Sequence, residues 1–448
     1  MSLGYNETDP GSIEDFGQRL IGKTVRDIVT KYTDNPASLD KGKLGNLIQE
    51  FHFGQKPNND PRPDFAKAGV ELKCTPVRTD KKGTYGAKER ISLSMIDFPS
   101  IMEESWPDCA YLKKNRKLLI VVYAYDPDAI VLDYRIIGVR LWSFDDLPDH
   151  EQYRIREDWK KIATKVRTGL AHELSEGDTE LLGAARKGGA GEKKRPQPAS
   201  SILAYRRAYT LKQGYVKELL KRDFHLVSER AESAYHSMED FSKAGGSIRT
   251  FTEGAFERFM GRADEQIART VGYPRNRSKS YHAMLSRRML GVPTWKIKEF
   301  EKADIIMKTV RLSPSGRPKE HVSFPAFVIK DLLKETWEES DFRAILERTF
   351  CFVVFRYDER GALRFEKTVF WTMPQDDIEG EAKRIWHEAR EAFGKGVTEG
   401  LPGAKENRVG HVRPHGKEGK DIDVLPDGST VTKQCFWLNQ DYVADVLA

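Results

Sequence analysis

The second half of the chain repeats, in the same order, sequence blocks that occur in its first half. The matching pairs are 65–73 with 300–308, 88–93 with 319–324, 120–126 with 352–358, 139–142 with 368–371, and 211–216 with 438–443. Blocks that recur in one order along a chain indicate two copies of one fold. We therefore predict two domains, at residues 1–240 and 248–448, and the length of 448 residues suits that division.

Composition narrows the class of protein. No apolar run approaches the roughly 20 residues that a membrane span needs, and the N-terminus lacks the basic and apolar regions of a signal peptide. The four cysteines are scattered, without the close spacing of a zinc site or a disulfide framework. These features predict a protein of the reducing cytoplasm, without a membrane partner.

Positive charge gathers in short runs. The net charge is +6, which is only mildly basic. The runs lie at 81–82, 113–117, 193–195 and 206–207. A single run is usually a solvated face, but several in one half of the chain favour a polyanionic partner, because phosphate contacts need local positive charge.

Two segments give contrasting structural signals. The continuous apolar run at 118–125 predicts a central strand that is buried on both faces. Residues 183–201 are rich in Gly, Lys, Pro and Ala, which predicts a flexible basic loop without packed structure.

Asp64 precedes a short apolar run that carries Glu71 and Lys73. Alternate residues of a strand point the same way, so Glu71 and Lys73 share one face, and the chain can fold the Asp64 carboxylate back beside Glu71. Two carboxylates and an ammonium can hold Mg²⁺ and position a water for phosphodiester cleavage. By spacing alone, a solvated strand face with a cross-strand ion pair is the more common explanation.

The repeat provides an internal comparison for these residues. Its second copy keeps Lys73 as Lys308 but loses the acidic cluster. The replacements are Glu299 for Asp64, Ile306 for Glu71, Leu346 for Lys114 and Arg287 for Glu50. The second copy cannot build the same metal site, so we predict that the first half is catalytic and that the second keeps only the scaffold.

With these residues in view, the first half resembles the MutH family of DNA endonucleases. The matching segments are 41–50, 63–65, 69–73, 113–114 and 209–212. The duplicated length resembles the Sau-type restriction enzymes, which carry a second, inactive MutH-like domain. The resemblance implies a restriction-endonuclease-like α/β fold of the PD-(D/E)xK type, a mixed sheet flanked by helices, present twice in tandem.

The resemblance also implies an activity and a site. It implies a type II restriction endonuclease that cleaves double-stranded DNA at 5′-GATC with Mg²⁺. Asp64 and Glu71 would be metal ligands, Lys73 would orient the attacking water, and Lys114 would be a further active-site lysine. Glu50 matches a supporting helix carboxylate, although Gln49 is a competing register because the interval after Gly45 is one residue longer here than in MutH.

DNA would be held by basic side chains. The candidates are Lys81, Lys82, Arg206, Arg207 and Lys212. Each suits a phosphate contact better than base readout. Further expected partners are a second DNA copy on residues 248–448 and a cognate DNA methyltransferase. We expect a monomer in solution that can dimerise on DNA.

Two other functions remain open. A mismatch-repair nickase of the MutH type would share the catalytic site but not the duplication. A non-cleaving DNA-binding regulator would share the basic segments but has no need for Asp64, Glu71 and Lys73 together.

Overall fold

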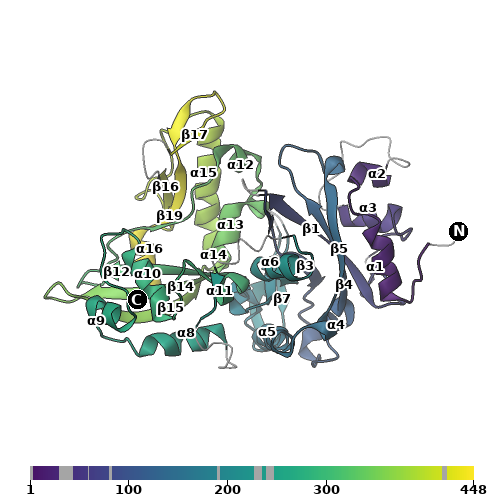
Figure 1. Ribbon diagram of the computed structural model, residues 1–448, viewed down its shortest axis with the longest axis horizontal. Helices are drawn as coiled ribbons and strands as arrows, with labels where there is room; N and C mark the ends of the chain where they lie inside the picture. Colours follow the sequence, from purple (N-terminus) through teal and green to yellow (C-terminus); the bar gives the residue numbers. More distant parts are fainter. Residues whose placement is uncertain are drawn as a thin grey trace. The chain divides into compact units, whose positions relative to one another are not determined.

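The chain folds into two units (Figure 1). Each unit contains helices and a sheet with both parallel and antiparallel strand pairs. The computed structural model describes residues 4–29, 44–58, 60–79, 83–188, 192–226, 235–238, 247–415 and 421–448. The first unit comprises Met1–Ser233 together with Lys302–Asp304. The second unit comprises Ala234–Glu301 and Ile305–Ala448.

The long apolar run of the first unit forms strand β4 (Lys117–Ala124), at the centre of a four-stranded sheet. It pairs in parallel with β1 (Val70–Thr79) and antiparallel with β5 (Arg135–Ser143), while β2 (Tyr85–Ala87) pairs with the other edge of β1. Leu118, Ile120 and Val122 enter one hydrophobic core, and Leu119 and Val121 enter another. The predicted strand, buried on both faces, is confirmed.

Helices cover the two faces of this sheet (Figure 1). On one face lie α1 (Pro10–Gln18), α2 (Val25–Val29) and α3 (Leu44–Phe51), which pack on Leu119 and Val121. The other core includes α5 (Asp149–Arg167) and α6 (Gln213–Arg222), with α4 (Ala110–Asn115) at its side. Short 3₁₀ turns occupy Ser100–Met102, Val131–Asp133, Phe144–Asp146, Ala171–Glu173 and Glu176–Asp178.

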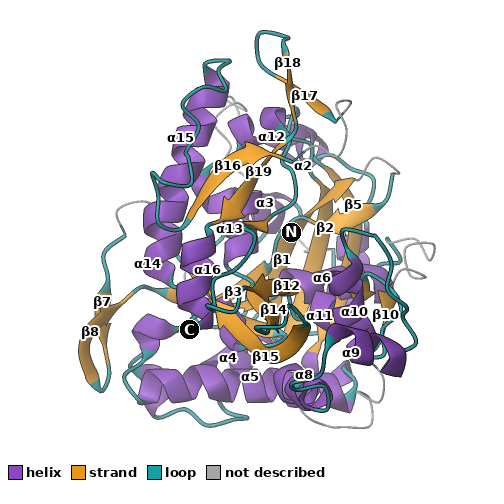
Figure 2. Cartoon of the chain, turned by 90° about the vertical axis from the view of Figure 1, so that its left-hand side faces the viewer, coloured by secondary structure: helices purple, strands orange, loops and turns teal. Residues whose placement is uncertain are grey.

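The segment predicted as a flexible loop at 183–201 is largely regular, so that prediction was wrong for its described part. Strand β6 (Leu182–Arg186) is buried and joins a second sheet in the order β3 (Ile91–Met95), β9 (Arg207–Leu211), β6. A Cβ at Gly183 would lie 2.6 Å from the Thr210 Oγ1, so its small size permits this close packing. Strands β7 (Arg195–Gln197) and β8 (Ser200–Ala204) form a separate hairpin (Figure 2).

Asp158, on helix α5, forms hydrogen bonds with the backbone at the start of β6. Its buried carboxylate accepts hydrogen bonds from the backbone N–H groups of Glu180 at 2.9 Å, Leu181 at 2.7 Å and Leu182 at 3.0 Å. Three otherwise unpaired backbone donors are thereby satisfied in the interior, where each would be costly to leave without an acceptor.

Asp158→Ala should therefore lower the free energy of unfolding by about 3 kcal/mol, because it leaves buried N–H groups without an acceptor. Urea denaturation followed by circular dichroism measures this loss. Glu157→Ala, which removes surface ion pairs with Lys160 and Arg156 on the same helix, is the matched control and should cost about 0.5 kcal/mol. Equal losses in the two variants would contradict the anchoring role of Asp158.

The second unit contains a three-stranded sheet in the order β12 (Ile305–Leu312), β14 (Thr349–Tyr357), β15 (Leu363–Thr372). β12 and β14 are parallel, and β14 and β15 are antiparallel. A smaller antiparallel sheet has the order β13 (Val322–Ser323), β19 (Gln434–Leu438), β16 (Gly410–Pro414). The core between them contains Phe350, Phe352, Trp386 and Phe436.

The remaining elements of the second unit surround these sheets. The helices are α8 (Ile248–Glu257), α9 (Asp264–Thr270), α10 (Tyr281–Met289), α11 (Lys298–Lys302), α12 (Ile329–Lys334), α13 (Asp341–Leu346), α14 (Gln375–Asp377), α15 (Lys383–Gly394) and α16 (Gln440–Leu447), with a 3₁₀ turn at Trp337–Glu339 and a π turn at Ile378–Ala382. Two strand pairs are β10 (Tyr235–His236) with β11 (Lys296–Ile297), and β17 (Ile422–Val424) with β18 (Thr430–Thr432). None of the helices in the described part of the chain combines the length and apolar character that crossing a membrane needs.

Candidate active site

Glu71 and Lys73 lie near the start of β1 and share one face of the strand. The Lys73 Nζ donates to the Glu71 Oε1 at 2.8 Å. Glu71 is only 4% exposed. The strand alternation that predicts this pair is therefore correct, but the Glu71 carboxylate is buried and Lys73 is partly buried, unlike the solvated ion pair of an ordinary strand face.

A tight turn brings Asp64 back beside Glu71. The backbone N–H of Phe65 donates to the Val70 carbonyl oxygen at 2.8 Å, and Gly69 has a φ of 68°, which favours glycine. The Asp64 Oδ2 accepts from the Leu72 N–H at 2.9 Å, and the Glu71 Oε2 accepts from the Asp64 N–H at 3.1 Å. These two interlocking bonds hold the carboxylates next to each other.

Lys114 brings a second ammonium from the last turn of α4. Its Nζ lies 3.8 Å from the Glu71 Oε1 and donates to the Asp60 carbonyl oxygen at 2.8 Å. The site therefore joins two carboxylates and two lysines from β1, the preceding turn and α4.

The electrostatics of Glu71 reflect this crowding. Burial raises the pKa of the Glu71 carboxyl, and the nearby Asp64 charge raises it further, while Lys73 and Lys114 lower it. The result is a close carboxylate pair, with Glu71 buried and Asp64 partly buried, and a bound cation would stabilise the charged form of Glu71.

The structure resolves the competing registers at the end of α3 in favour of Gln49. The Gln49 side chain is buried, and its Nε2 donates to the Asp64 Oδ1 at 3.1 Å. Glu50 is exposed, because adjacent helical residues point about 100° apart. The prediction that Glu50 supports the site is thus replaced by Gln49.

Gln49→Ala should lower the rate of DNA cleavage about 10- to 100-fold, because Asp64 loses one of the groups that orient its carboxylate. Single-turnover cleavage of a duplex with one target measures the change. Glu50→Ala alters the neighbouring, exposed position and should leave the rate within about twofold, as for an ordinary surface change. A larger loss in Glu50→Ala than in Gln49→Ala would reverse the assignment.

The structure separates the candidate DNA-binding residues. Arg207 and Lys212 are buried: the Arg207 Nη1 donates to the Ala184 carbonyl oxygen at 3.1 Å, and the Lys212 Nζ donates to the Thr179 carbonyl oxygen. Backbone carbonyl oxygens hold both cationic groups in the interior, so this geometry does not present either side chain for the predicted phosphate contact. Arg206 is half-buried and ion-paired with Glu192 at 2.6 Å, while Lys81 and Lys82 lie outside the described residues.

Lys187 is a further basic residue near Lys73, and it is not among the candidates predicted from the sequence. Its Nζ donates to the Ser92 Oγ at 2.5 Å. Burial lowers the pKa of Lys187, and the nearby positive charges of Arg90 and Lys73 act in the same direction. No motif marks Lys187 in the sequence, and it lies in the segment that was predicted as a flexible loop.

The donor set fits a hard divalent cation. Asp64 and Glu71 supply carboxylate oxygens, and burial, together with the neighbouring Asp64 charge, raises the pKa of Glu71. Among the described residues, no group of three or more His, Cys, Asp or Glu side chains is arranged so that it could hold a metal ion. Mg²⁺ commonly uses one or two carboxylates and takes its other oxygens from water and phosphate, so two suffice.

Comparison with known proteins places this site in context. Residues 53–158 match the family model described as DNA mismatch repair enzyme MutH, a range that contains Asp64, Glu71, Lys73 and Lys114. The chain is 30% identical to the type II restriction enzyme Sau3AI of Staphylococcus aureus, over 96% of this chain and 97% of that protein. It is 27% identical to the DNA mismatch repair protein MutH of Shewanella woodyi, over 43% of this chain and 83% of that protein. It is 26% identical to MutH of Escherichia coli K12, over 46% of this chain and 90% of that protein.

Proposed function

The chain belongs to the family that contains the type II restriction enzyme Sau3AI and the MutH proteins, and we propose that it is itself a type II restriction endonuclease that hydrolyses phosphodiester bonds of double-stranded DNA. The observation that carries the proposal is the hydrogen-bonded cluster of Asp64, Glu71 and Lys73 around the start of β1, with Glu71 buried. The likeness to Sau3AI extends over nearly the whole of both chains, whereas the MutH proteins match less than half of this one. That difference favours restriction over mismatch repair.

The target that the family resemblance implies is the palindrome 5′-GATC. A restriction endonuclease requires a partner DNA methyltransferase that protects the same sequence in the host. Cleavage of DNA at a different short palindrome would refute this target without affecting the proposed chemistry.

The side chains divide the work of hydrolysis. Asp64 and Glu71 would hold Mg²⁺, which when bound neutralises charge on the phosphate and assists the leaving 3′-oxygen. Lys73, already fixed by its 2.8 Å bond to Glu71, would orient the attacking water and stabilise the charge that develops on the phosphate. Gln49 and the Leu72 N–H keep the Asp64 carboxylate in one orientation, and Lys114 adds positive charge beside Glu71.

The two units would be tandem copies of one restriction-endonuclease-like fold, at residues 1–240 and 248–448. Strand pairs of the first unit have counterparts at the repeat positions of the second, which supports the duplication. The pairs are Glu71–Leu118 with Ile306–Phe350, Leu118–Trp142 with Phe350–Trp371, and Ile91–Leu211 with Val322–Leu438. Gly69 and Asp304, which match in the repeat, also share a positive φ, of 68° and 55°.

The second copy would bind DNA without cutting it. Ile306 occupies the Glu71 position, and the Glu299 carboxylate, at the Asp64 position, accepts from the Met238 N–H at 3.1 Å. The chain would then have one catalytic centre. Cleavage of both strands would require either two chains that meet on the DNA or two successive nicks by one chain.

A plasmid digest with Mg²⁺ tests the proposed function. Unmethylated, hemimethylated and fully adenine-methylated plasmids would be compared, with cleavage positions mapped by sequencing. Double-strand cuts at 5′-GATC are the expected result. Binding without cleavage of either plasmid would favour the non-cleaving regulator, and preferred nicking of hemimethylated sites would favour a mismatch-repair nickase.

A further inference from the structure

A cavity of about 150 Å³ in the second unit is lined by residues 308–311 and 319–323. It contains Lys308, which occupies on β12 the place of Lys73 on β1: Lys308 pairs with Phe352 as Lys73 pairs with Ile120. The cavity therefore occupies the position in the second unit that matches the catalytic lysine of the first.

The charge of this cavity differs from that of the catalytic site. Lys308, Arg311 and Lys319 line it, against one carboxylate, Glu320, which pairs with Arg311. His321 adds an imidazole to the lining. The cavity thus carries a net positive charge. In the catalytic site of the first unit, by contrast, two carboxylates balance two lysines.

Lys308 is the member without an acidic partner. Its Nζ donates to the Ser323 carbonyl oxygen at 2.5 Å and lies 5.7 Å from the centre of the Phe324 ring. Within the described residues, no carboxylate comes within ion-pair distance of this ammonium. Burial lowers the pKa of Lys308 to about 8, with Arg287 acting in the same direction, so an anion would stabilise its charged form.

We propose that this cavity binds a phosphodiester group of DNA directly, without a metal ion. The inference rests on the proposed function, because it specifies where the non-cleaving copy holds its DNA. In the first unit, the carboxylates would require a cation between themselves and a phosphate. In the second unit, Ile306 has removed that negative charge, and the ammonium of Lys308 can pair with the phosphate oxygen itself.

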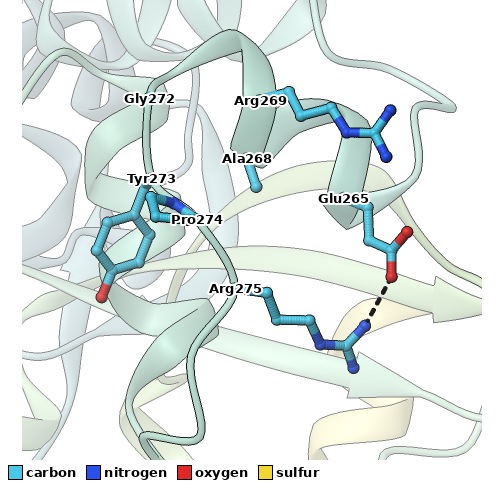
Figure 3. A pocket seen from close by; sticks show the side chains of 7 residues that line it. All are labelled: Glu265, Ala268, Arg269, Gly272, Tyr273, Pro274 and Arg275. Carbon is cyan, nitrogen blue, oxygen red and sulfur yellow. Dashed lines mark hydrogen bonds and ion pairs between the residues drawn. The ribbon is translucent and has the colours of Figure 1, made fainter.

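A larger cavity of the second unit, about 380 Å³, makes a useful contrast (Figure 3). It is lined by Arg269, Tyr273 and Arg275 among others, but Arg275 is already paired with Glu265 at 3.0 Å. Figure 3 shows that pair spanning one side of the cavity, away from Tyr273. Its cations are exposed and one is neutralised, so it lacks the buried, unbalanced charge that distinguishes the Lys308 cavity.

The first test locates the contact. The full chain would be treated with an amine-reactive reagent in EDTA, with and without saturating 5′-GATC duplex, and labelling of each lysine would be followed by mass spectrometry. Labelling of Lys308 should slow at least about fivefold in the presence of duplex. Lys395, an exposed lysine paired with Glu391 on α15, should label at an unchanged rate. Protection of Lys308 by inorganic phosphate but not by duplex would overturn the assignment to DNA.

The second test uses Lys308→Met, with Lys395→Met as its control, in EDTA. Loss of one phosphate contact should weaken duplex binding about tenfold and reduce the slope of log affinity against log salt by about 0.9. Unchanged affinity and slope in Lys308→Met, with the same melting temperature as the parent, would refute the inference. Both outcomes are independent of cleavage, so a chain that protects Lys308 but cuts no DNA would refute the nuclease function alone.

Discussion

Glu71→Gln is expected to lower the rate of DNA cleavage by a factor of about 10³ or more, because it removes the buried negative charge that would hold the metal ion. The substitution keeps the size and shape of the side chain. Burial already raises the Glu71 pKa, so the folded chain tolerates an uncharged group at this position. The melting temperature should therefore change little, and duplex binding in EDTA should stay within a few-fold of the parent.

The measurement is single-turnover cleavage of a duplex with one target, at saturating enzyme and over a range of Mg²⁺ concentrations. Glu50→Gln makes the same chemical change at an exposed position of α3, next to Gln49, and serves as the control. Cleavage by Glu71→Gln within tenfold of the parent, with Glu50→Gln unaffected, would remove Glu71 from the catalytic site.

The strand features of this site were accessible from the sequence because they follow from short-range geometry. Alternation along β1 correctly placed Glu71 and Lys73 together. Continuous apolar character correctly identified β4. The residue spacing also anticipated the return of Asp64, because the turn that ends at Gly69 leaves few residues in which the chain can reverse.

The sequence-based predictions differed from the structure where they depended on how deeply a side chain is buried, or on which of two adjacent helical residues faces the site. Arg207 lies in β9, and every residue of that strand is buried. Lys212 directly follows the strand and is buried as well. The sequence shows which residues are charged, but not whether their side chains are buried. The choice between Gln49 and Glu50 depended on where α3 places each side chain, because a shift of one helical residue rotates a side chain by about 100°.

Lys73→Met is expected to reduce cleavage about 10²- to 10⁴-fold, the range that a positioned proton-transfer or charge-stabilising group commonly provides. Methionine keeps the unbranched length of the side chain and removes the ammonium. Glu71 would lose the partner at 2.8 Å that lowers its pKa, so its carboxyl would become harder to ionise. The variant should therefore need more Mg²⁺ for half-maximal cleavage and should also remain slower at saturating Mg²⁺.

These two effects distinguish a catalytic lysine from one that only neutralises Glu71. A lysine that served only to balance charge would be fully replaced by saturating Mg²⁺, and Lys73→Met would then recover the parental rate. Lys67→Met is the matched control, because Lys67 lies in the same turn but is exposed and pairs with Glu7 at 2.6 Å. Full recovery of Lys73→Met at high Mg²⁺ would thus leave Lys73 as a structural counter-ion and would transfer the water-orienting role to Lys114, the other ammonium beside Glu71.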